Sequence, residues 1–300
     1  MRKLVSLLVI ALLIAMAAAC TTSGASTSPN ASGGDFSPSA RANGHHTVTA
    51  DPKTPILKIT NSGGLAPPGY QLTEVPIFAL YGDGCVIVRG AVDAMYPGPL
   101  LPNLRELRVT PDDIQKILAA AETAGLLGPD ASYEQPGIAD AETVVFRTTA
   151  GGATHVVDAY ALSEAVGGPA GPDEAARTKL RDFEAHILNL AGLLGRAIND
   201  ASYQPTSMRV FAQSASATTQ SGLTPQEPAW PLTQDPAIAG QPSIVPGVRC
   251  IAIDGEDLAS FMEAAKTARS NTVWTAHSGR YSVTVRPLYP DESGCPSMAD

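Results

Sequence analysis

The chain has 300 residues, of which 44% are apolar and 16% charged, and its formal net charge is −9. This length allows one large domain or two modest domains with cores of their own. The chain has 20 Lys and Arg residues against 29 Asp and Glu residues, and the basic residues form no continuous run. This composition argues against binding to nucleic-acid phosphates. The 27 Gly and 25 Pro residues predict many turns and some unstructured segments.

Residues 1–19 have the pattern of a secretory signal peptide. Arg2 and Lys3 precede an uncharged run, Leu4–Ala19, in which Ser6 is the only polar residue. This run of 16 residues is shorter than the ~20 that a membrane-spanning helix needs. We therefore expect a signal core that is removed after secretion.

Ala17-Ala18-Ala19-Cys20 ends this run and resembles the lipobox of bacterial lipoproteins, although the family pattern favours Leu where Ala17 stands. The resemblance implies that Cys20 is acylated and anchors the chain at the outer face of a bacterial cytoplasmic membrane. The alternative is an ordinary signal peptide, with Cys20 lost or unmodified. Loss of residues 1–19 would move the net charge from −9 to −11, so acyl chains rather than charge would hold the protein at an anionic membrane.

Residues 20–54 are predicted to form a disordered, lipid-anchored tether. Thr21–Ala50 consists mostly of small and polar residues, with Phe36 as its only aromatic residue, and cannot bury enough surface to fold. As a flexible coil it would reach roughly 30 Å. His45-His46 lies near its end without further ligands nearby, so we interpret this pair as part of the linker. The sequence predicts no metal and no cofactor.

The first folded module is expected at residues 55–200, beginning with a strand at Ile56–Ile59. Two apolar runs, Pro76–Tyr81 and Cys85–Arg89, flank Gly82-Asp83-Gly84, which is typical of a β-hairpin with a tight turn. A turn aspartate usually bonds its own backbone, so we expect Asp83 to have that role rather than a catalytic one.

Two helices and a second hairpin follow in this module. Thr110 and the next three residues, Pro-Asp-Asp, are a helix start, an apolar stripe runs to Ala121, and Gly125 ends the helix. The runs 143–148 and 154–160 predict a hairpin, and Lys179–Leu194 predicts a second helix.

The second half of the chain repeats part of this pattern at a constant offset of 144 residues. Ile251–Ile253 correspond to Leu107–Val109, Asp254 takes the place of the Thr110 cap, and an apolar stripe and a hairpin follow. We therefore predict an α+β fold of two related modules, each of antiparallel hairpins packed against one or two helices. The second module would span residues 206–296; one continuous domain with similar helices is the alternative.

A long segment, residues 213–247, is rich in Pro, Ser, Thr and Gln and shows no periodicity. Such loops are usually functional or serve as linkers. Trp230 lies within it and is the candidate partner contact, with anchoring of the loop to its own module as the equal alternative.

The cysteines predict a secreted protein with one disulfide. Cys250 and Cys295 bracket the second module and are the expected pair, while pairing of Cys85 with Cys250 is the alternative. Cys85 follows a turn and enters an apolar strand, which indicates a buried, inert thiol.

Residues 70–194 also resemble an uncharacterised bacterial domain found in small secreted or lipid-anchored proteins. The resemblance consists of short motifs and implies no activity and no catalytic residue. The motifs are Tyr81-Gly82-Asp83-Gly84, Ala124-Gly125-Leu126-Leu127, Tyr133, Asp140 and His155-Val156-Val157.

The sequence contains no Gly-x-Ser-x-Gly, His-Glu-x-x-His, Cys-x-x-Cys, Ser-x-x-Lys or Gly-x-Gly-x-x-Gly motif and no phosphate-binding Gly-Lys-Ser/Thr, and we predict no catalytic residue. We expect a lipid-anchored, extracytoplasmic binding or interaction module that meets an envelope protein or polymer. One alternative is an envelope hydrolase, which needs several of Asp83, Asp140, His155 and Asp158 to converge. A solute-binding lipoprotein is the other, and it would need parallel sheets that the hairpins do not favour.

Overall fold

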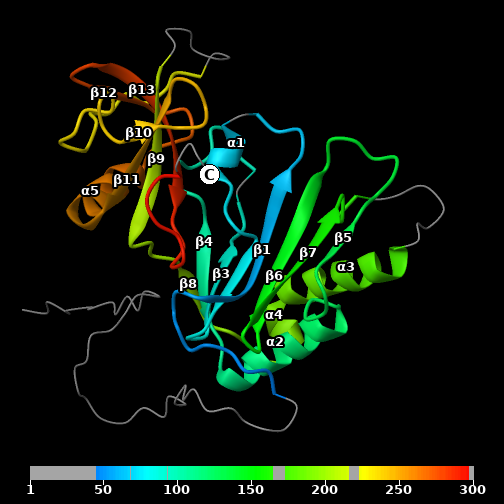
Figure 1. Cartoon of the computed structure of the whole chain (residues 1–300). Helices are drawn as coiled ribbons and strands as arrows, with labels where there is room; N and C mark the ends of the chain where they lie inside the picture. Colours follow the sequence, from blue (N-terminus) through cyan, green and yellow to red (C-terminus); the bar gives the residue numbers. More distant parts are fainter. Residues whose placement is uncertain (1–44, 68, 93, 165–172, 216–222, 297–300) are drawn as a thin grey trace, which may run out of the picture.

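A computed structural model gives the fold of the chain (Figure 1) and describes residues 45–67, 69–92, 94–164, 173–215 and 223–296. The expected signal peptide, the lipobox with Cys20 and most of the tether lie outside these residues. The described chain forms two sheets, rich in antiparallel pairs, with a few helices, so the predicted α+β class is confirmed.

The larger sheet takes its eight strands from residues 55–202, in the order β5-β7-β6-β1-β2-β3-β4-β8. Neighbouring strands are antiparallel, except that β5 runs parallel to β7. The strands are β1 (Pro55–Gly63), β2 (Phe78–Tyr81), β3 (Cys85–Arg89), β4 (Leu104–Arg108), β5 (Ala131–Tyr133), β6 (Glu142–Ala150), β7 (Ala153–Tyr160) and β8 (Asp200–Ser202).

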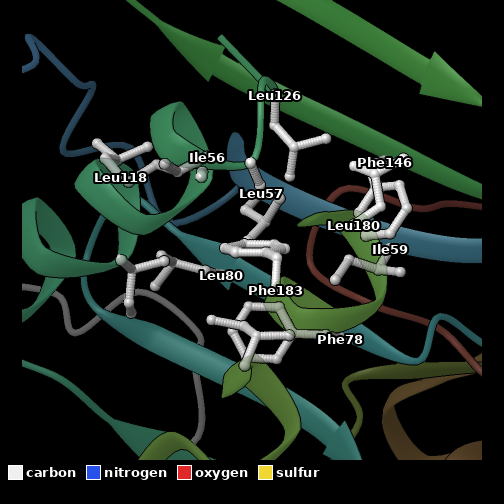
Figure 2. Packing of buried hydrophobic residues seen from close by; sticks show 14 of the residues in the cluster. Ile56, Leu57, Ile59, Phe78, Leu80, Leu118, Leu126, Phe146, Leu180 and Phe183 are labelled. Carbon is white, nitrogen blue, oxygen red and sulfur yellow. The ribbon is translucent and has the colours of Figure 1, made fainter. Parts of the chain in front are cut away.

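Three helices cover one face of this sheet (Figure 1): α2 (Pro111–Thr123), α3 (Glu174–Leu188) and α4 (Leu190–Leu194). Helix α2 begins where predicted, because the Thr110 hydroxyl accepts from the Asp113 N–H while the Asp113 carboxylate accepts from the Thr110 N–H. Apolar side chains of both layers form the core between them, as Figure 2 shows for Ile56, Leu57, Ile59, Phe78, Leu80, Leu118, Leu126, Phe146, Leu180 and Phe183.

The helix predicted at Lys179–Leu194 differs from the observed helices in its start and its continuity. Helix α3 begins five residues earlier, at Glu174, and the chain leaves helical geometry at Asn189, with φ −106° and ψ 60°. The Asn189 side chain then accepts a hydrogen bond from the N–H of Gly192 and so caps α4. A short polar side chain that can bond its own backbone explains the break, which apolar periodicity alone does not reveal.

Both predicted hairpins of the first module are present. In the β2–β3 turn, Gly84 has φ +80°, and the Asp83 carboxylate accepts from the Cys85 N–H at 3.0 Å. In the β6–β7 turn, Gly151 and Gly152 have φ +60° and +80°, a geometry that favours glycine. Asp83 therefore has the turn role expected for it.

The smaller sheet takes its five strands from the second half of the chain, in the order β10-β11-β9-β13-β12. Helix α5 (Gly255–Ala265) packs against it, and the core contains the fully buried Trp274 and Phe261. The strands are β9 (Ser207–Ser214), β10 (Gln241–Pro242), β11 (Val248–Asp254), β12 (Val273–Ala276) and β13 (Gly279–Pro287).

The internal repeat extends over one strand and one helix in each module. Strand β4 leads into α2 as β11 leads into α5, although the Asp254 side chain makes no capping hydrogen bond. The hairpins then enter their sheets in opposite order. The earlier strand, β6, pairs with the sheet interior in the first module, whereas the later strand, β13, does so in the second. The sequence similarity therefore reflects a local unit rather than a repeated topology.

Each module contributes residues to the core of the other. Leu100, in the loop between β3 and β4, packs into the core of the second module, where its N–H donates to the Ala268 carbonyl. In the other direction, Tyr289 follows β13 and packs on the first sheet with Tyr81 and Tyr203. Both contacts join residues far apart in sequence, and together they connect the two modules.

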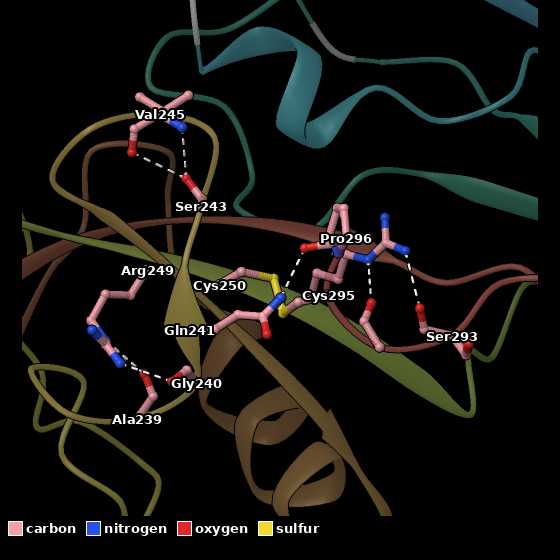
Figure 3. The surroundings of a disulfide bond; sticks show 12 residues. Ala239, Gly240, Gln241, Ser243, Val245, Arg249, Cys250, Ser293, Cys295 and Pro296 are labelled. Atoms are coloured by element: carbon pink, nitrogen blue, oxygen red, sulfur yellow. Dashed lines mark hydrogen bonds between the residues drawn. A yellow bond between two sulfur atoms is a disulfide. The ribbon is translucent and has the colours of Figure 1, made fainter. Parts of the chain in front are cut away.

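The predicted disulfide between Cys250 and Cys295 is confirmed, which excludes the pairing of Cys85 with Cys250. Figure 3 shows how it fixes the C-terminal segment beside β11, where the Gln241 side chain also donates to the Pro296 carbonyl. Cys85 is fully buried, as expected, but none of the described cysteines is free. The expectation of a spare thiol at Cys85 is therefore wrong.

Candidate functional site

The chain enters the first module at one end of the larger sheet. The backbone N–H of His46 donates to the Gln115 side chain at 2.8 Å, and the same side chain donates back to the His46 carbonyl at 3.0 Å. The Thr47 carbonyl accepts from Gly151 in the β6–β7 turn. The folded part therefore begins well before Pro55, its expected start. A glutamine side chain can both accept from a backbone N–H and donate to a backbone carbonyl, so Gln115 fixes the extended segment at His46. We call this the tether end.

The opposite end of the sheet carries exposed apolar side chains. β1 runs from the tether end toward Gly63, and both the loop before α1 (Tyr70–Thr73) and the loop after β3 lie at that far end (Figure 1). Five of the nine exposed large hydrophobic residues in the described chain lie in these two loops and in α1, and we call these five residues the apolar end. The residues and their exposed fractions are Leu65 (84%), Tyr70 (45%), Val92 (74%), Met95 (50%) and Tyr96 (69%).

The loop after β3 is held at both sides although its apolar side chains face solvent. The Gly98 carbonyl accepts from the Ser270 N–H, and the Arg269 guanidinium contacts the Met95 sulfur at 3.5 Å. Arg89, at the end of β3, pairs with the Glu74 carboxylate. These contacts hold apolar groups in water rather than folding them inward, and exposed apolar surface that is held in place often marks an interaction site.

A cavity of about 270 Å³ lies between the end of β1 and helix α1 at the apolar end. Among the described residues, its charged groups are the carboxylates of Glu74 and Glu142, and no cationic side chain lines it. The remaining lining residues are Asn61, Ser62, Gly63, Tyr70 and Gln71. We call it the acidic cavity.

The acidic cavity has more hydrogen-bond acceptors than donors within the described chain. The Asn61 side chain donates to the Glu142 carboxylate at 2.6 Å, while its own oxygen is buried without a partner. No cation pairs with Glu142 among the described residues, whereas Glu74 is neutralised by Arg89. Burial raises the pKa of Tyr70, and the Glu74 and Glu142 carboxylates raise it further. The field inside this cavity is therefore negative.

A second cavity, of about 340 Å³, shares Asn61 and Glu74 with the first and lies where the C-terminal segment meets β1. Four charged residues form a cluster there, which we call the tail ion cluster: Lys58, Arg286, Asp291 and Glu292. Lys58 Nζ lies 2.7 Å from an Asp291 oxygen and 3.2 Å from a Glu292 oxygen. Arg286 contacts both oxygens of Glu292, at 2.7 and 2.8 Å.

The tail ion cluster is mostly withdrawn from solvent. The Glu292 side chain is 15% exposed and that of Arg286 10%. Burial alone would raise the pKa of Glu292, but the hydrogen bonds and charge of Arg286, with the charge of Lys58 and the Tyr289 N–H, lower it to about 2. Burial, with the nearby Asp291 carboxylate that accepts its hydrogen bond, raises the pKa of Tyr81. The tail ion cluster thus connects the two modules, and its two cations and two carboxylates neutralise each other.

Arg147 differs from the other cations of the second cavity. It lies opposite Lys58 in the register of β1 and β6, on the face of the sheet away from the helices. Its side chain is exposed, and within the described chain it has no ion-pair partner. Its charge can therefore attract an anionic group without breaking the cluster.

The residues needed for the hydrolase alternative do not converge. Asp83 lies in the β2–β3 turn and accepts from Arg108 at 2.8 Å, while Asp140 lies before β6 at the other end of the sheet. His155 and Asp158 lie on β7 three residues apart, so their side chains point to opposite faces, and His155 contacts the Gly128 carbonyl at 2.6 Å. None of these four lines either cavity. The observed geometry therefore removes the premise of that alternative.

Trp230 packs within its own module. Its ring centroid lies 6.0 Å from that of Phe261 and 6.2 Å from that of Trp274, and its indole N–H donates to the Gln234 carbonyl at 2.8 Å. Its backbone N–H donates to Thr275 of β12. Trp230 thus anchors the segment 213–247 to the second module, which is one of its two expected roles. Contact of Trp230 with a partner stays a prediction.

The described chain offers few other places for a ligand. Its edge strands β5, β8 and β10 have two or three residues each, and β12 donates hydrogen bonds to residues 226–228. Among the described residues no group of His, Cys, Asp and Glu could hold a metal ion, and no helix there is long and apolar enough to cross a membrane. The only parallel pair of strands in this part of the chain is β5 with β7, unlike the parallel sheets expected of a solute-binding lipoprotein.

Comparison with protein-family models, with curated proteins and with solved structures gave no match.

The acidic cavity and the tail ion cluster have no local signature in the sequence. Lys58 and Asp291 are 233 positions apart, and Asn61 and Glu142 are 81 apart, so no local spacing connects them. The exposed apolar groups had a weak signal, since Val92, Met95 and Tyr96 lie in a Gly- and Pro-rich stretch where apolar residues are unusual.

Proposed function

We propose that the protein is a lipid-anchored, extracytoplasmic interaction module that binds an envelope protein or polymer through its apolar end. The observation that carries this proposal is the position of the apolar end, at the side of the larger sheet away from the docked His46–Thr47 segment. A chain anchored at Cys20 would then reach its partner with the end that lies farther from the tether.

The N-terminal sequence supports the anchoring half of the proposal. An apolar run that ends at Cys20 and continues into a polar segment fits acylation at the outer face of a bacterial cytoplasmic membrane. β1 has nine residues, so the tether end and the apolar end lie roughly 30 Å apart. The partner-binding surface would accordingly point away from the membrane.

Metabolic labelling with a fatty-acid probe tests the anchor. We expect labelling of the wild-type protein, and loss of both the label and the membrane fraction in Cys20→Ala. Labelling that persists in Cys20→Ala would contradict acylation at this residue.

Variants at the apolar end test the interaction half. Leu65→Ser and Tyr96→Ser remove exposed side chains, so we expect them to reduce recovery of a reproducible partner from intact envelopes while the fold is kept. Leu188→Ser is the matched control, because Leu188 is also exposed (53%) but lies at the end of α3. Equal recovery with all three variants would contradict the assignment of the apolar end.

A further inference from the structure

We propose that the acidic cavity is a binding site for a primary ammonium group, and that its occupant is a lysine side chain of a protein partner. The inference rests on the proposed function for the partner, but the chemistry of the site comes from the cavity itself.

The charge of the cavity selects a cation. Glu142 and Glu74 line it, Arg89 neutralises only Glu74, and no described cation pairs with Glu142. A lysine ammonium has three N–H donors and no acceptor, so it suits a site whose free groups are acceptors. An entering anion would meet the uncompensated Glu142 carboxylate and be repelled.

Hydrogen bonding leads to the same ligand. The Asn61 side-chain oxygen is buried and receives no hydrogen bond within the part of the chain that the structure describes, and an unsatisfied buried acceptor costs roughly 1–3 kcal/mol. The side-chain nitrogen of Asn61 donates to the Glu142 carboxylate at 2.6 Å, and both residues line the cavity. Ser62 and Tyr70 also line the cavity, and a hydroxyl group can accept a hydrogen bond from the remaining N–H groups.

Size and surroundings favour a lysine side chain over a free amine or an amino sugar. The volume of about 270 Å³ lies below the roughly 300–1,000 Å³ of most small-molecule sites and suits one long side chain. The exposed Leu65 lies just beyond Gly63 and the exposed Tyr70 is in the lining, so apolar neighbours of the lysine would find contacts.

Peptide binding to the full-length chain tests the site directly. The probe is the capped tripeptide acetyl-Phe-Lys-Phe-amide, and its matched control replaces lysine with norleucine, which keeps the methylenes and removes the ammonium. We expect the lysine peptide to bind about tenfold more tightly in an NMR titration, with shifts at Asn61, Tyr70 and Glu142. Equal binding of the two peptides would overturn the inference.

Two variants connect the binding to the cavity. Glu142→Gln keeps an acceptor for Asn61 and removes the charge, so we expect it to weaken lysine-peptide binding about tenfold and leave norleucine-peptide binding unchanged. Gln71→Lys places an ammonium of the protein's own at the exposed rim and should also block the peptide. Glu256→Gln, at an exposed carboxylate in the first turn of α5, is the control and should have no effect. Equal effects of Glu142→Gln and Glu256→Gln would contradict the site.

A third probe separates the source of the ammonium and keeps the two proposals distinct. Glucosamine tetramer that binds more tightly than the lysine peptide, in a Glu142-dependent way, would overturn the lysine assignment in favour of an amino sugar. Failure of all probes, with partner recovery that still depends on Leu65 and Tyr96, would overturn this inference and leave the proposed function in place. Probe binding without any envelope partner would support the site and contradict the proposed function.

Discussion

Removal of the charge of Glu292 should destabilise the protein in a way that depends on pH. Glu292→Gln is nearly isosteric but leaves Arg286 and Lys58 with too little negative charge in a mostly buried cluster. The folded state lowers the pKa of Glu292 from its usual 4.5 to about 2. At about 1.36 kcal/mol for each pKa unit, this difference corresponds to about 3 kcal/mol of stability at pH 7.

The sign of the pH effect follows from the lowered pKa. The contribution of ionised Glu292 is fully present above pH 4.5, its pKa in the unfolded chain, and is lost as the pH falls toward about 2. Glu292→Gln lacks this contribution at every pH. The difference in unfolding free energy between wild type and variant should therefore shrink from about 3 kcal/mol at pH 7 to about 1 kcal/mol at pH 3.

Urea unfolding at pH 7, 5, 4 and 3, followed by far-UV circular dichroism and tryptophan fluorescence together, measures this difference. Trp230 and Trp274 both report on the second module, so coincident transitions also show whether the two modules unfold together. Glu256→Gln is the control and should change the unfolding free energy by less than about 1 kcal/mol, because it removes only an exposed charge at a helix N-terminus. A Glu292→Gln effect that stays the same from pH 7 to pH 3, or one below about 0.5 kcal/mol at pH 7, would refute the reasoning.

Three further predictions concern the anchoring of peripheral segments. Trp230→Ala loses the packing on Phe261 and Trp274, so it should lower the free energy of unfolding by about 2–3 kcal/mol and lower the melting temperature. An unchanged melting temperature would contradict the packing role. Gln115→Ala should speed amide exchange at His46 and its neighbours, measured by mass spectrometry, with little change in global stability; unchanged exchange would show that Gln115 does not hold the segment. Replacement of the disulfide-bonded cysteines that are 45 positions apart by alanine should cost about 4 kcal/mol in denaturant unfolding, and a loss under 1 kcal/mol would contradict the chain-entropy estimate.

Local patterns predicted most of the elements in the described chain. The Thr110 cap, the glycines of the two turns and the apolar stripes act within about ten residues, so helix α2 and both hairpins could be read from the sequence. Asn189 shows the limit of that reasoning. Its side chain interrupts an apolar stripe that continues on both sides, and only the backbone geometry reveals the break.

The arrangement of the elements could not be predicted in the same way. The similarity at an offset of 144 residues suggests two equal modules. Which strand of each hairpin pairs with the rest of its sheet, however, depends on distant neighbours, β1 for β6 and β9 for β13. The disulfide was predictable because the sequence contains only four cysteines and so offers few pairings. The candidate site was not, because Asn61, Glu142 and Tyr70 come together only through the folded sheet and α1.

Photo-crosslinking in intact cells tests the central claim, that the apolar end contacts an envelope partner, most directly. A photoreactive residue would replace Tyr96 at the apolar end or, as the control, Leu188 on the helix-covered side. We expect a discrete crosslinked product from position 96 that is absent at position 188. The product should also disappear when the chain with the photoreactive residue at position 96 carries Leu65→Ser and Glu142→Gln as well. Crosslinking that is equal at both positions, or that occurs only at position 188, would contradict the claim.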